Sequence, residues 1–155
     1  MTITSNGKGM RILLLEDNDN VVYSIINIAK RLGYSILQTQ DFSEADYWID
    51  SDPKLDSFDY LIVDLSIPCV YMDYFSKEEY CELEDISKDC KLSGWIWLKR
   101  LCKKYPDAKR KIIVLSAFLT HLPESEKSIY GSGIIFFEKA RTETVTELNK
   151  LLSES

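Results

Sequence analysis

Residues 59–64 read DYLIVD, a short apolar run that ends in the carboxylate of Asp64. An apolar run of this length predicts a β-strand that is buried on both faces, as strands of parallel sheets are. Four other short runs share this character, and helix-like segments separate all five. The predicted strands are Arg11–Leu15, Tyr34–Thr39, Asp59–Asp64, Lys111–Leu115 and Gly133–Phe137.

The segments between the predicted strands carry apolar residues at helical spacing. Gly33 ends the first helix, Ser43 opens the second, and Pro53 stops it. This alternation predicts an α/β fold of the flavodoxin-like, doubly wound type, with five parallel strands in the order 2-1-3-4-5 between two helical layers. The predicted helices are Asn20–Leu32, a segment from Ser43, Gly94–Tyr105, part of Leu119–Tyr130, and Thr142–Leu152.

The chain has 155 residues, of which 45% are hydrophobic, and a formal net charge of −6. These values indicate one globular domain, which we place at residues 10–155 behind a flexible tail of residues 1–9. Because the chain is acidic and has no basic run, nucleic acid is not expected as a partner. No apolar run could span a membrane, and the polar N-terminus is not a secretory signal, so we expect a cytoplasmic protein. Four cysteines without a CxxC pair indicate reduced thiols rather than a zinc site.

Polar residues follow several of the predicted strands, at the sheet edge where open parallel sheets bind ligands. Taken one at a time, these residues have ordinary explanations. Asp17, Asn18 or Asp19 could cap the first helix, and the others could be loop or surface residues. The residues at the strand ends are Glu16, Asp17, Asp64, Ser116, Glu138 and Lys139.

Together, the acids at this edge point to a cation. Glu16, Asp17 and Asp64 would repel one another if the topology brings them together. Mg²⁺ binds carboxylate oxygens, waters and phosphate oxygens, and would relieve this repulsion. The sequence therefore predicts a magnesium site with room for a phosphate.

This arrangement resembles the receiver family (CheY-like) of two-component signalling, in family order and at nearly family spacing. ILLLEDN (residues 12–18) supplies the acidic pair, and LIVDLSIP (61–68) the phospho-acceptor strand. VLSA (114–117) supplies a hydroxyl, and FFEK (136–139) a lysine. The resemblance covers residues 10–68 and 93–152.

The resemblance implies that Asp64 accepts a phosphoryl group from a sensor histidine kinase, a histidine phosphotransfer protein or a small phosphodonor. Mg²⁺ would be held by the side chains of Asp17 and Asp64, by the backbone carbonyl of Ser66, and by Glu16 through water. Lys139 and Ser116 would contact the phosphoryl oxygens. Such a protein is a phospho-acceptor that catalyses only its own phosphorylation and dephosphorylation.

Five positions bear on the switch and on the lifetime of the phosphate. In the family, the hydroxyl of Ser116 moves toward the phosphoryl group and an aromatic side chain follows, here Phe136, which could equally be a core residue. Ala140 replaces the family's proline. Phe118 and Ser66 take the positions that flank the attacking water, and an apolar Phe118 predicts slow loss of phosphate.

Besides these substitutions, the chain departs from the family pattern by a long insertion, residues 69–93. Pro68 and Gly94 stand 26 residues apart, where the family has about four. The sequence Ser76-Lys77-Glu78-Glu79 has capping-box spacing and predicts a helix over about 77–88. The segment could also be a solvated acidic loop without a function. If it has a function, we expect a lid or a partner-docking arm beside the site. Its acids are Asp73, Glu78, Glu79, Glu82, Glu84, Asp85 and Asp89, against Lys77, Lys88 and Lys91.

Two functions remain open at this point. A receiver without an attached output module acts in trans on an unknown downstream protein. The family's usual contact face, for a partner or a second copy, is formed by the helix within 119–130, the strand 133–137 and the helix 142–152. The alternative is a degenerate receiver that binds partners without being phosphorylated. A glycine-rich cofactor loop is excluded, because Glu16 to Asp19 would repel a phosphate.

Overall fold

The computed structural model describes residues 10–68, 74–86, 91–139 and 143–154. Five parallel strands form one sheet in the order β2-β1-β3-β4-β5, which confirms the order expected from the sequence. The predicted tail of residues 1–9 lies outside the described residues. The strands are β1 Arg11–Leu15, β2 Ser35–Thr39, β3 Tyr60–Val63, β4 Ile112–Ser116 and β5 Ile135–Glu138.

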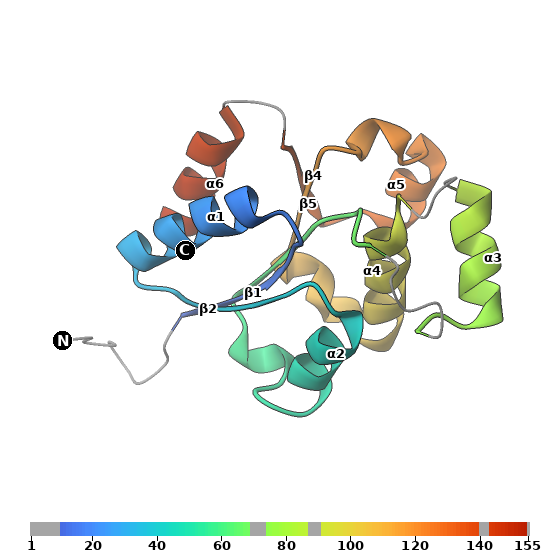
Figure 1. Cartoon of the computed structure of the whole chain (residues 1–155), viewed down its shortest axis with the longest axis horizontal. Coiled ribbons are helices and arrows are strands. Elements are labelled where there is room, and N and C mark those ends of the chain that lie inside the picture. The colour runs from blue at the N-terminus through green and yellow to red at the C-terminus, as the bar shows by residue number, and fades with distance from the viewer. Residues whose placement is uncertain (1–9, 69–73, 87–90, 140–142, 155) are drawn as a thin grey trace.

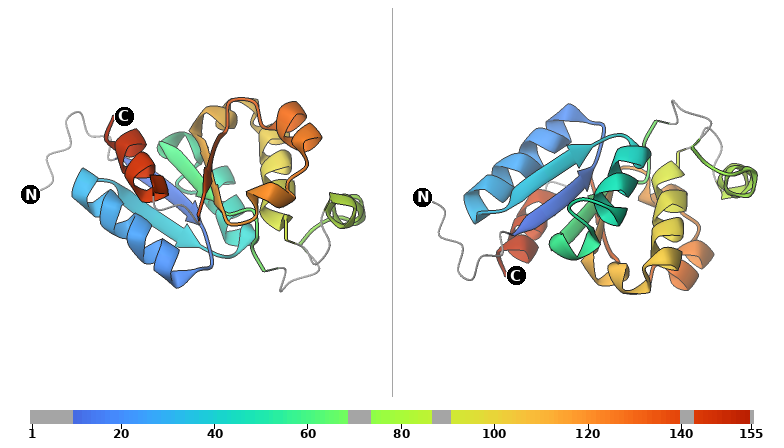
Figure 2. Two further views of the ribbon diagram at one scale, coloured as in Figure 1. Left: turned by 90° about the horizontal axis from the view of Figure 1, so that it is seen from above. Right: turned by 90° about the horizontal axis from the view of Figure 1, so that it is seen from below.

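Helices cover both faces of the sheet (Figures 1 and 2). On one face lie α1 (Asp19–Leu32) and α6 (Glu143–Ser153), which contact each other. On the other face lie α2 (Phe42–Asp50), α4 (Ser93–Lys104) and α5 (Glu124–Tyr130). A further helix, α3 (Lys77–Ile86), packs outside α4, on the side of the molecule away from both termini.

Two apolar cores lie on the two sides of the sheet, because successive strand residues point to opposite faces. Leu13 and Val63 face the core under α2 and α4. Leu14 and Ile62 face the core under α1 and α6. Strands β1, β3 and β4 are almost completely buried, which explains why their sequences are continuously apolar.

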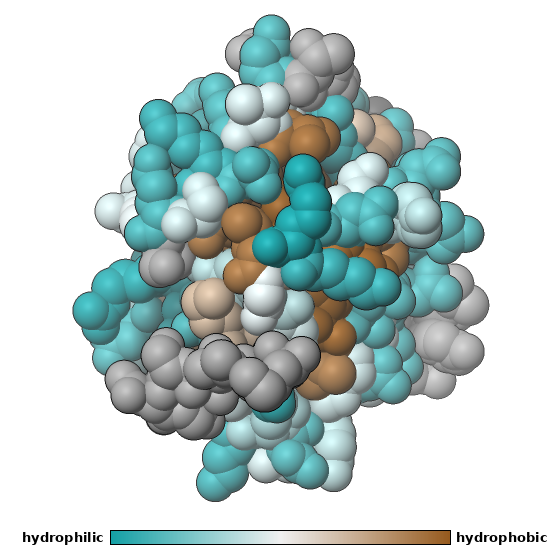
Figure 3. All heavy atoms as spheres, turned by 90° about the vertical axis from the view of Figure 1, so that its left-hand side faces the viewer, coloured by the Kyte–Doolittle hydropathy of each residue, from teal (hydrophilic) through white to brown (hydrophobic). Residues whose placement is uncertain are grey.

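The surface of the molecule is mainly polar, as expected when the apolar residues fill the two cores. On the side that holds both termini, hydrophilic residues cover most of the molecule and hydrophobic ones show between them (Figure 3). Within the described residues, none of the helices combines the length and apolar character that crossing a membrane requires.

The start of α1 shows which of Asp17, Asn18 and Asp19 caps the helix. The side chain of Asn18 caps the helix, accepting from the backbone N–H groups of Asn20 (3.0 Å) and Val21 (3.3 Å). Asp17 is therefore not needed as the cap. At the other end, Gly33 adopts a left-handed conformation (φ 83°), as the predicted end of the helix requires.

Several predicted boundaries differ from the structure by one or two residues, and the cause is clear for two of them. Helix α2 begins at Phe42, not Ser43, because the side chain of Asp41 caps it by accepting from Ser43 N–H (2.8 Å). Strand β5 begins at Ile135 instead of Gly133, because Gly133 has φ 89°, which is incompatible with an extended strand.

The described part of residues 69–93, which we call the acidic segment, is not a solvated loop. Ser76 and Glu79 form the predicted capping box, in which Ser76 N–H donates to Glu79 Oε1 (2.9 Å) and Glu79 N–H donates to Ser76 Oγ (3.2 Å). Leu83 of α3 is completely buried. The helix prediction is thus confirmed over α3, Lys77–Ile86, and residues 69–73 and 87–90 lie outside the described residues.

Candidate phosphoryl and metal site

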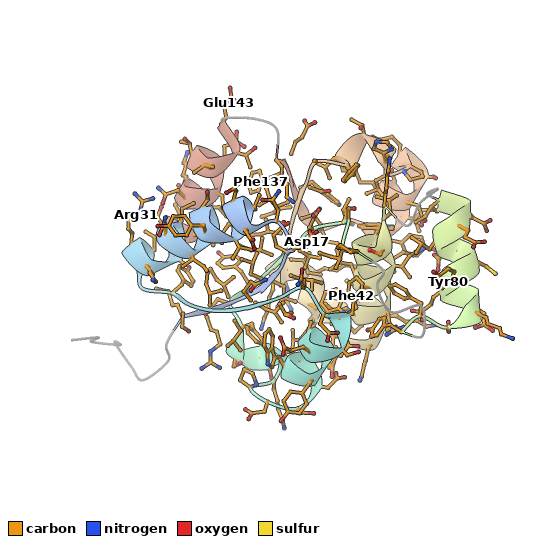
Figure 4. The ribbon with its side chains drawn as sticks, viewed as in Figure 1. Asp17, Arg31, Phe42, Tyr80, Phe137 and Glu143 are labelled. Atoms are coloured by element: carbon orange, nitrogen blue, oxygen red, sulfur yellow. The ribbon has the colours of Figure 1, made fainter. Side chains whose placement is uncertain are left out.

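The ends of β1 and β3 bring three carboxylates together. Strands β1 and β3 pair in parallel with Leu15 opposite Val63, so the next residues of both strands leave the sheet side by side. The backbone N–H of Asp64 donates to Leu15 O (3.0 Å), which fixes Asp64 beside Glu16 and Asp17. Figure 4 shows Asp17 near the centre of the molecule, at the end of β1.

Glu16, Asp17 and Asp64 form a compact acidic cluster. One carboxylate oxygen from each lies within 4.8 Å of the others. Glu16 and Asp64 are almost completely buried, at 1% and 4% exposure. Two buried carboxylates this close need a positive charge, since desolvation and mutual repulsion both disfavour their ionised forms.

Lys139 supplies part of that charge from the end of β5. Its Nζ donates to Asp64 Oδ2 (2.9 Å) and to Glu16 Oε1 (2.9 Å). Its backbone N–H donates to Ser116 O (3.1 Å), which holds the ends of β4 and β5 together. Burial opposes the charged form of Lys139, but the bonds to Glu16 and Asp64 outweigh it and raise the pKa of this lysine.

One lysine does not neutralise the cluster. Burial first, and then repulsion by Asp64, raise the pKa of Glu16 to about 7, although bonds from Lys139 and Asn18 N–H oppose the rise. A site of oxygen ligands with surplus negative charge fits a hard divalent cation, and Mg²⁺ in particular, which uses one or two carboxylates and keeps several waters.

The remaining predicted site residues lie around the cluster. Ser116 is fully buried as the last residue of β4, and its Oγ accepts from Phe118 N–H (3.1 Å). Ser66 N–H donates to Asp64 Oδ1 (3.2 Å), so Ser66 contacts the Asp64 side chain, while the predicted role of its carbonyl stays a prediction. Ala140 lies outside the described residues.

Phe136 and Phe118 are both partly buried. The centroids of the Phe136 and Trp95 rings are 6.1 Å apart, so Phe136 packs against a core residue of α4. Phe118 stacks edge-on against His121 at 5.5 Å. The switch role of Phe136 stays a prediction, since these contacts suit a core residue equally well.

Gly94 is a structural requirement that the periodicity of the sequence did not reveal. A Cβ atom at this position would lie 2.1 Å from the backbone oxygen of Asp64, and Gly94 N–H donates to Leu65 O (2.8 Å). The start of α4 therefore packs directly on the backbone of Asp64. The sequence shows a glycine at a helix start, but nothing in it shows which backbone that glycine approaches.

Comparison with known proteins supports the fold. No family model matches the sequence, and no curated protein does. Solved structures do match. A response regulator receiver domain protein from Clostridium thermocellum is 16% identical, with a TM-score of 0.60 and coverage of 94% of this chain and 92% of that one.

Two further structures give the same result. The signal receiver domain of an HD domain-containing protein from Pseudomonas fluorescens Pf-5 is 15% identical, with a TM-score of 0.59 and 94% of each chain covered. The receiver domain of a sensor histidine kinase from Pseudomonas aeruginosa PAO1, solved with a magnesium ion in its active-site cleft, is 18% identical, with a TM-score of 0.60 and coverage of 94% and 96%. This chain therefore has the receiver fold, as the sequence predicted.

Proposed function

We propose that this protein is a receiver that accepts a phosphoryl group on Asp64 with the help of Mg²⁺. The observation that carries the proposal is the double contact of Lys139 with Asp64 and Glu16, beside Asp17 and next to Ser116 at the end of the neighbouring strand β4. This combination of a carboxylate nucleophile, a cation and surplus acids suits the transfer of an anionic group. The likeness to solved receiver domains supports it.

The reaction follows from the chemistry of these groups. An oxygen of Asp64 attacks the phosphorus of a phosphohistidine or acyl phosphate, and the donor's bond to phosphorus breaks with its electron pair leaving on the donor. Asp17, Asp64, Glu16 and the Ser66 carbonyl would hold Mg²⁺, which supplies charge neutralisation. Lys139 pairs with the phosphoryl oxygens, and Ser116 hydrogen-bonds one of them.

The partners would be a sensor histidine kinase or histidine phosphotransfer protein upstream and an unknown protein target downstream. Three exposed apolar side chains support a contact face formed by α5, β5 and α6: Ile129 is 65% exposed, Ile135 37% and Val145 51%. Exposed apolar side chains on adjacent elements are typical of protein contacts. A second copy of the chain could use the same face, and light scattering with and without beryllofluoride separates the two cases.

The test uses two neighbouring aspartates. Asp17 belongs to the acidic cluster, whereas Asp19 is exposed at the first residue of α1. Incubation with acetyl phosphate should phosphorylate the wild type and Asp19→Asn in Mg²⁺ but not in EDTA, and should leave Asp17→Asn largely unmodified. Equal phosphorylation of both variants would contradict the metal site. Absence of phosphorylation in the wild type would favour the degenerate receiver.

A further inference from the structure

The acidic segment leaves and rejoins the fold next to the candidate site. Ser93 Oγ donates to Ile67 O (2.6 Å) and accepts from Ile67 N–H (3.2 Å), so the last residue of the segment is bonded to the chain just before the segment. Ile67 lies three residues after Asp64. The described part between these ends therefore forms a lobe anchored beside the acceptor.

The lobe is fixed to α2 and α4. Arg100 of α4 bonds both carboxylate oxygens of Glu79 and also donates to Tyr74 Oη. The Tyr74 ring stacks on Phe42 at the start of α2, with 5.3 Å between centroids. Together with the burial of Leu83, these contacts make α3 a packed element whose position is set by α4.

A single lysine of α4 joins this lobe to α5. Lys99 Nζ donates to Glu82 of α3 and to Glu126 of α5, at 2.9 Å in the second case. The same ammonium lies 3.9 Å from the centroid of the Tyr130 ring, at the end of α5. Lys99 and Glu126 are 13% and 14% exposed, so this part of the bridge is largely shielded from water.

The C-terminal end of the lobe, near its anchor at Ser93, contacts the loop that follows β4. Lys91 Nζ lies 5.6 Å from the centroid of the Phe118 ring. Phe118 N–H in turn bonds Ser116 Oγ, the hydroxyl of the candidate site. The acidic segment therefore acts on the region between β4 and β5 at two places. Lys91 contacts Phe118 just after β4, and Glu82 is bridged through Lys99 to α5.

Helix α5 itself covers Phe136. Lys127 Nζ lies 4.8 Å from the centroid of the Phe136 ring. A Cβ atom added to Gly131 would lie 3.1 Å from the same ring. Phe136 thus contacts Lys127 of α5 and the residue that follows the helix, so a movement of Phe136 would change its contacts with α5.

Open space adjoins two of the bridging groups. A cavity of about 800 Å³ lies between α3, α4 and the end of α5, lined among others by Glu82, Lys99 and Tyr130. The side chains of Glu82 and Lys99 therefore have room to separate without repacking of the sheet core. Figure 1 shows α3, α4 and α5 next to one another on the side away from the termini.

We propose that the acidic segment braces α5 in the arrangement seen here, through the bridge Glu82–Lys99–Glu126 and the contact of Lys91 with Phe118. This inference rests on the proposed function, because it holds that phosphorylation of Asp64 works against the brace. In the braced arrangement Lys139 Nζ bonds Asp64 itself and Ser116 Oγ accepts from Phe118 N–H, so both groups engage the protein rather than a phosphoryl group. Removing the brace therefore shifts the population toward the arrangement in which they engage a phosphoryl group.

The experiment compares Glu82→Gln with Glu84→Gln, an exposed residue of the same helix that matches it in charge and chemistry. The first readout is hydrogen exchange of residues 124–130 without any phosphodonor. The second is the binding of beryllofluoride in Mg²⁺. Glu82→Gln should exchange faster in α5 and bind beryllofluoride about two- to fivefold more tightly, as expected for loss of a partly buried ion pair. Glu84→Gln should match the wild type in both.

The outcomes separate the two proposals. Normal beryllofluoride binding with identical α5 exchange in both variants would overturn the brace alone. Faster exchange in Glu82→Gln with unchanged beryllofluoride affinity would show a structural contact that is not linked to phosphorylation, and would also overturn it. A wild type that fails to bind beryllofluoride would instead overturn the proposed function. Because Glu126→Gln cuts the same bridge from the α5 side, it should reproduce the gain in affinity.

Discussion

Lys139 sits between two buried carboxylates, Glu16 and Asp64, so its charge is part of the structure as well as of the chemistry. The topological argument from sequence correctly placed these residues together, because parallel strands end at one sheet edge. It could not show that Lys139 bonds both acids at once, since that depends on side-chain conformation. It also could not show that Asn18, and not Asp17, caps α1.

Replacing Lys139 by Met should destabilise the metal-free protein. The change leaves Glu16 and Asp64 buried without a cation, and losing one partner of a buried charge group costs about 3 kcal/mol. Urea unfolding in EDTA should show this loss, and saturating Mg²⁺ should restore part of it. Lys150→Met, at an exposed position of α6, serves as the control. A loss of the same size with and without Mg²⁺ would speak against a shared metal site.

Glu16 should make the metal-free protein less stable as pH rises. Its pKa in the folded protein is raised from 4.5 to about 7, so between these values the folded state keeps a proton that the unfolded state has lost. Each increase in pH within this window then favours unfolding, and Mg²⁺ binding, which expels that proton, should strengthen.

Urea unfolding in EDTA from about pH 5 to about pH 8 tests this prediction by comparing the wild type with Glu16→Gln. The difference between the two stabilities should change across the window. Parallel pH profiles would contradict the assignment of the shifted pKa to Glu16.

At the scale of elements, the buried strands and the helix α3 were predictable, whereas the packing of α3 against α4 was not. The residues of β1, β3 and β4 are apolar throughout because both of their faces are covered, and this pattern has few alternatives. The acidic segment suits a loop as well as a helix by composition. What fixes α3 is the pairing of Glu79 with Arg100, more than twenty residues away along the chain, which periodicity does not reveal.

Gly94→Ala should damage the fold and the site together. The added methyl group would lie 2.1 Å from Asp64 O, so α4 or the backbone of Asp64 must move. Overpacking of this kind costs about 2–3 kcal/mol. The midpoint temperature of thermal unfolding and the rate of phosphorylation by acetyl phosphate should both fall. Ser128→Ala, at an exposed position of α5, should change neither. Normal stability in Gly94→Ala would refute the close packing of α4 on Asp64.

At the scale of the whole molecule, the receiver fold places Asp64 at one sheet edge, and the acidic lobe packs beside α4 and is bridged to α5. Tyr80 of that lobe lies on the side of the molecule away from the termini (Figure 4). The fold was predicted almost completely from the sequence, whereas the lobe's contacts came only from the structure. The proposed signal therefore runs from Asp64 to α5 through groups that the lobe touches.

Phe118 should make the phosphorylated state long-lived. Its apolar ring cannot hydrogen-bond a water beside Asp64, and it is held between His121 and Lys91. After removal of acetyl phosphate, the phosphorylated fraction should persist well beyond minutes, as followed by intact mass. A lifetime of minutes or less would count against this reading of Phe118, and Phe118→Glu should shorten the lifetime.

The central claim is that Asp64 accepts a phosphoryl group. Intact-mass measurement after incubation with acetyl phosphate and Mg²⁺ tests it most directly, with Asp64→Asn as the comparison. We expect the wild type to gain the mass of one phosphoryl group and Asp64→Asn to gain none. An unmodified wild type, or equal modification of both proteins, would contradict the claim.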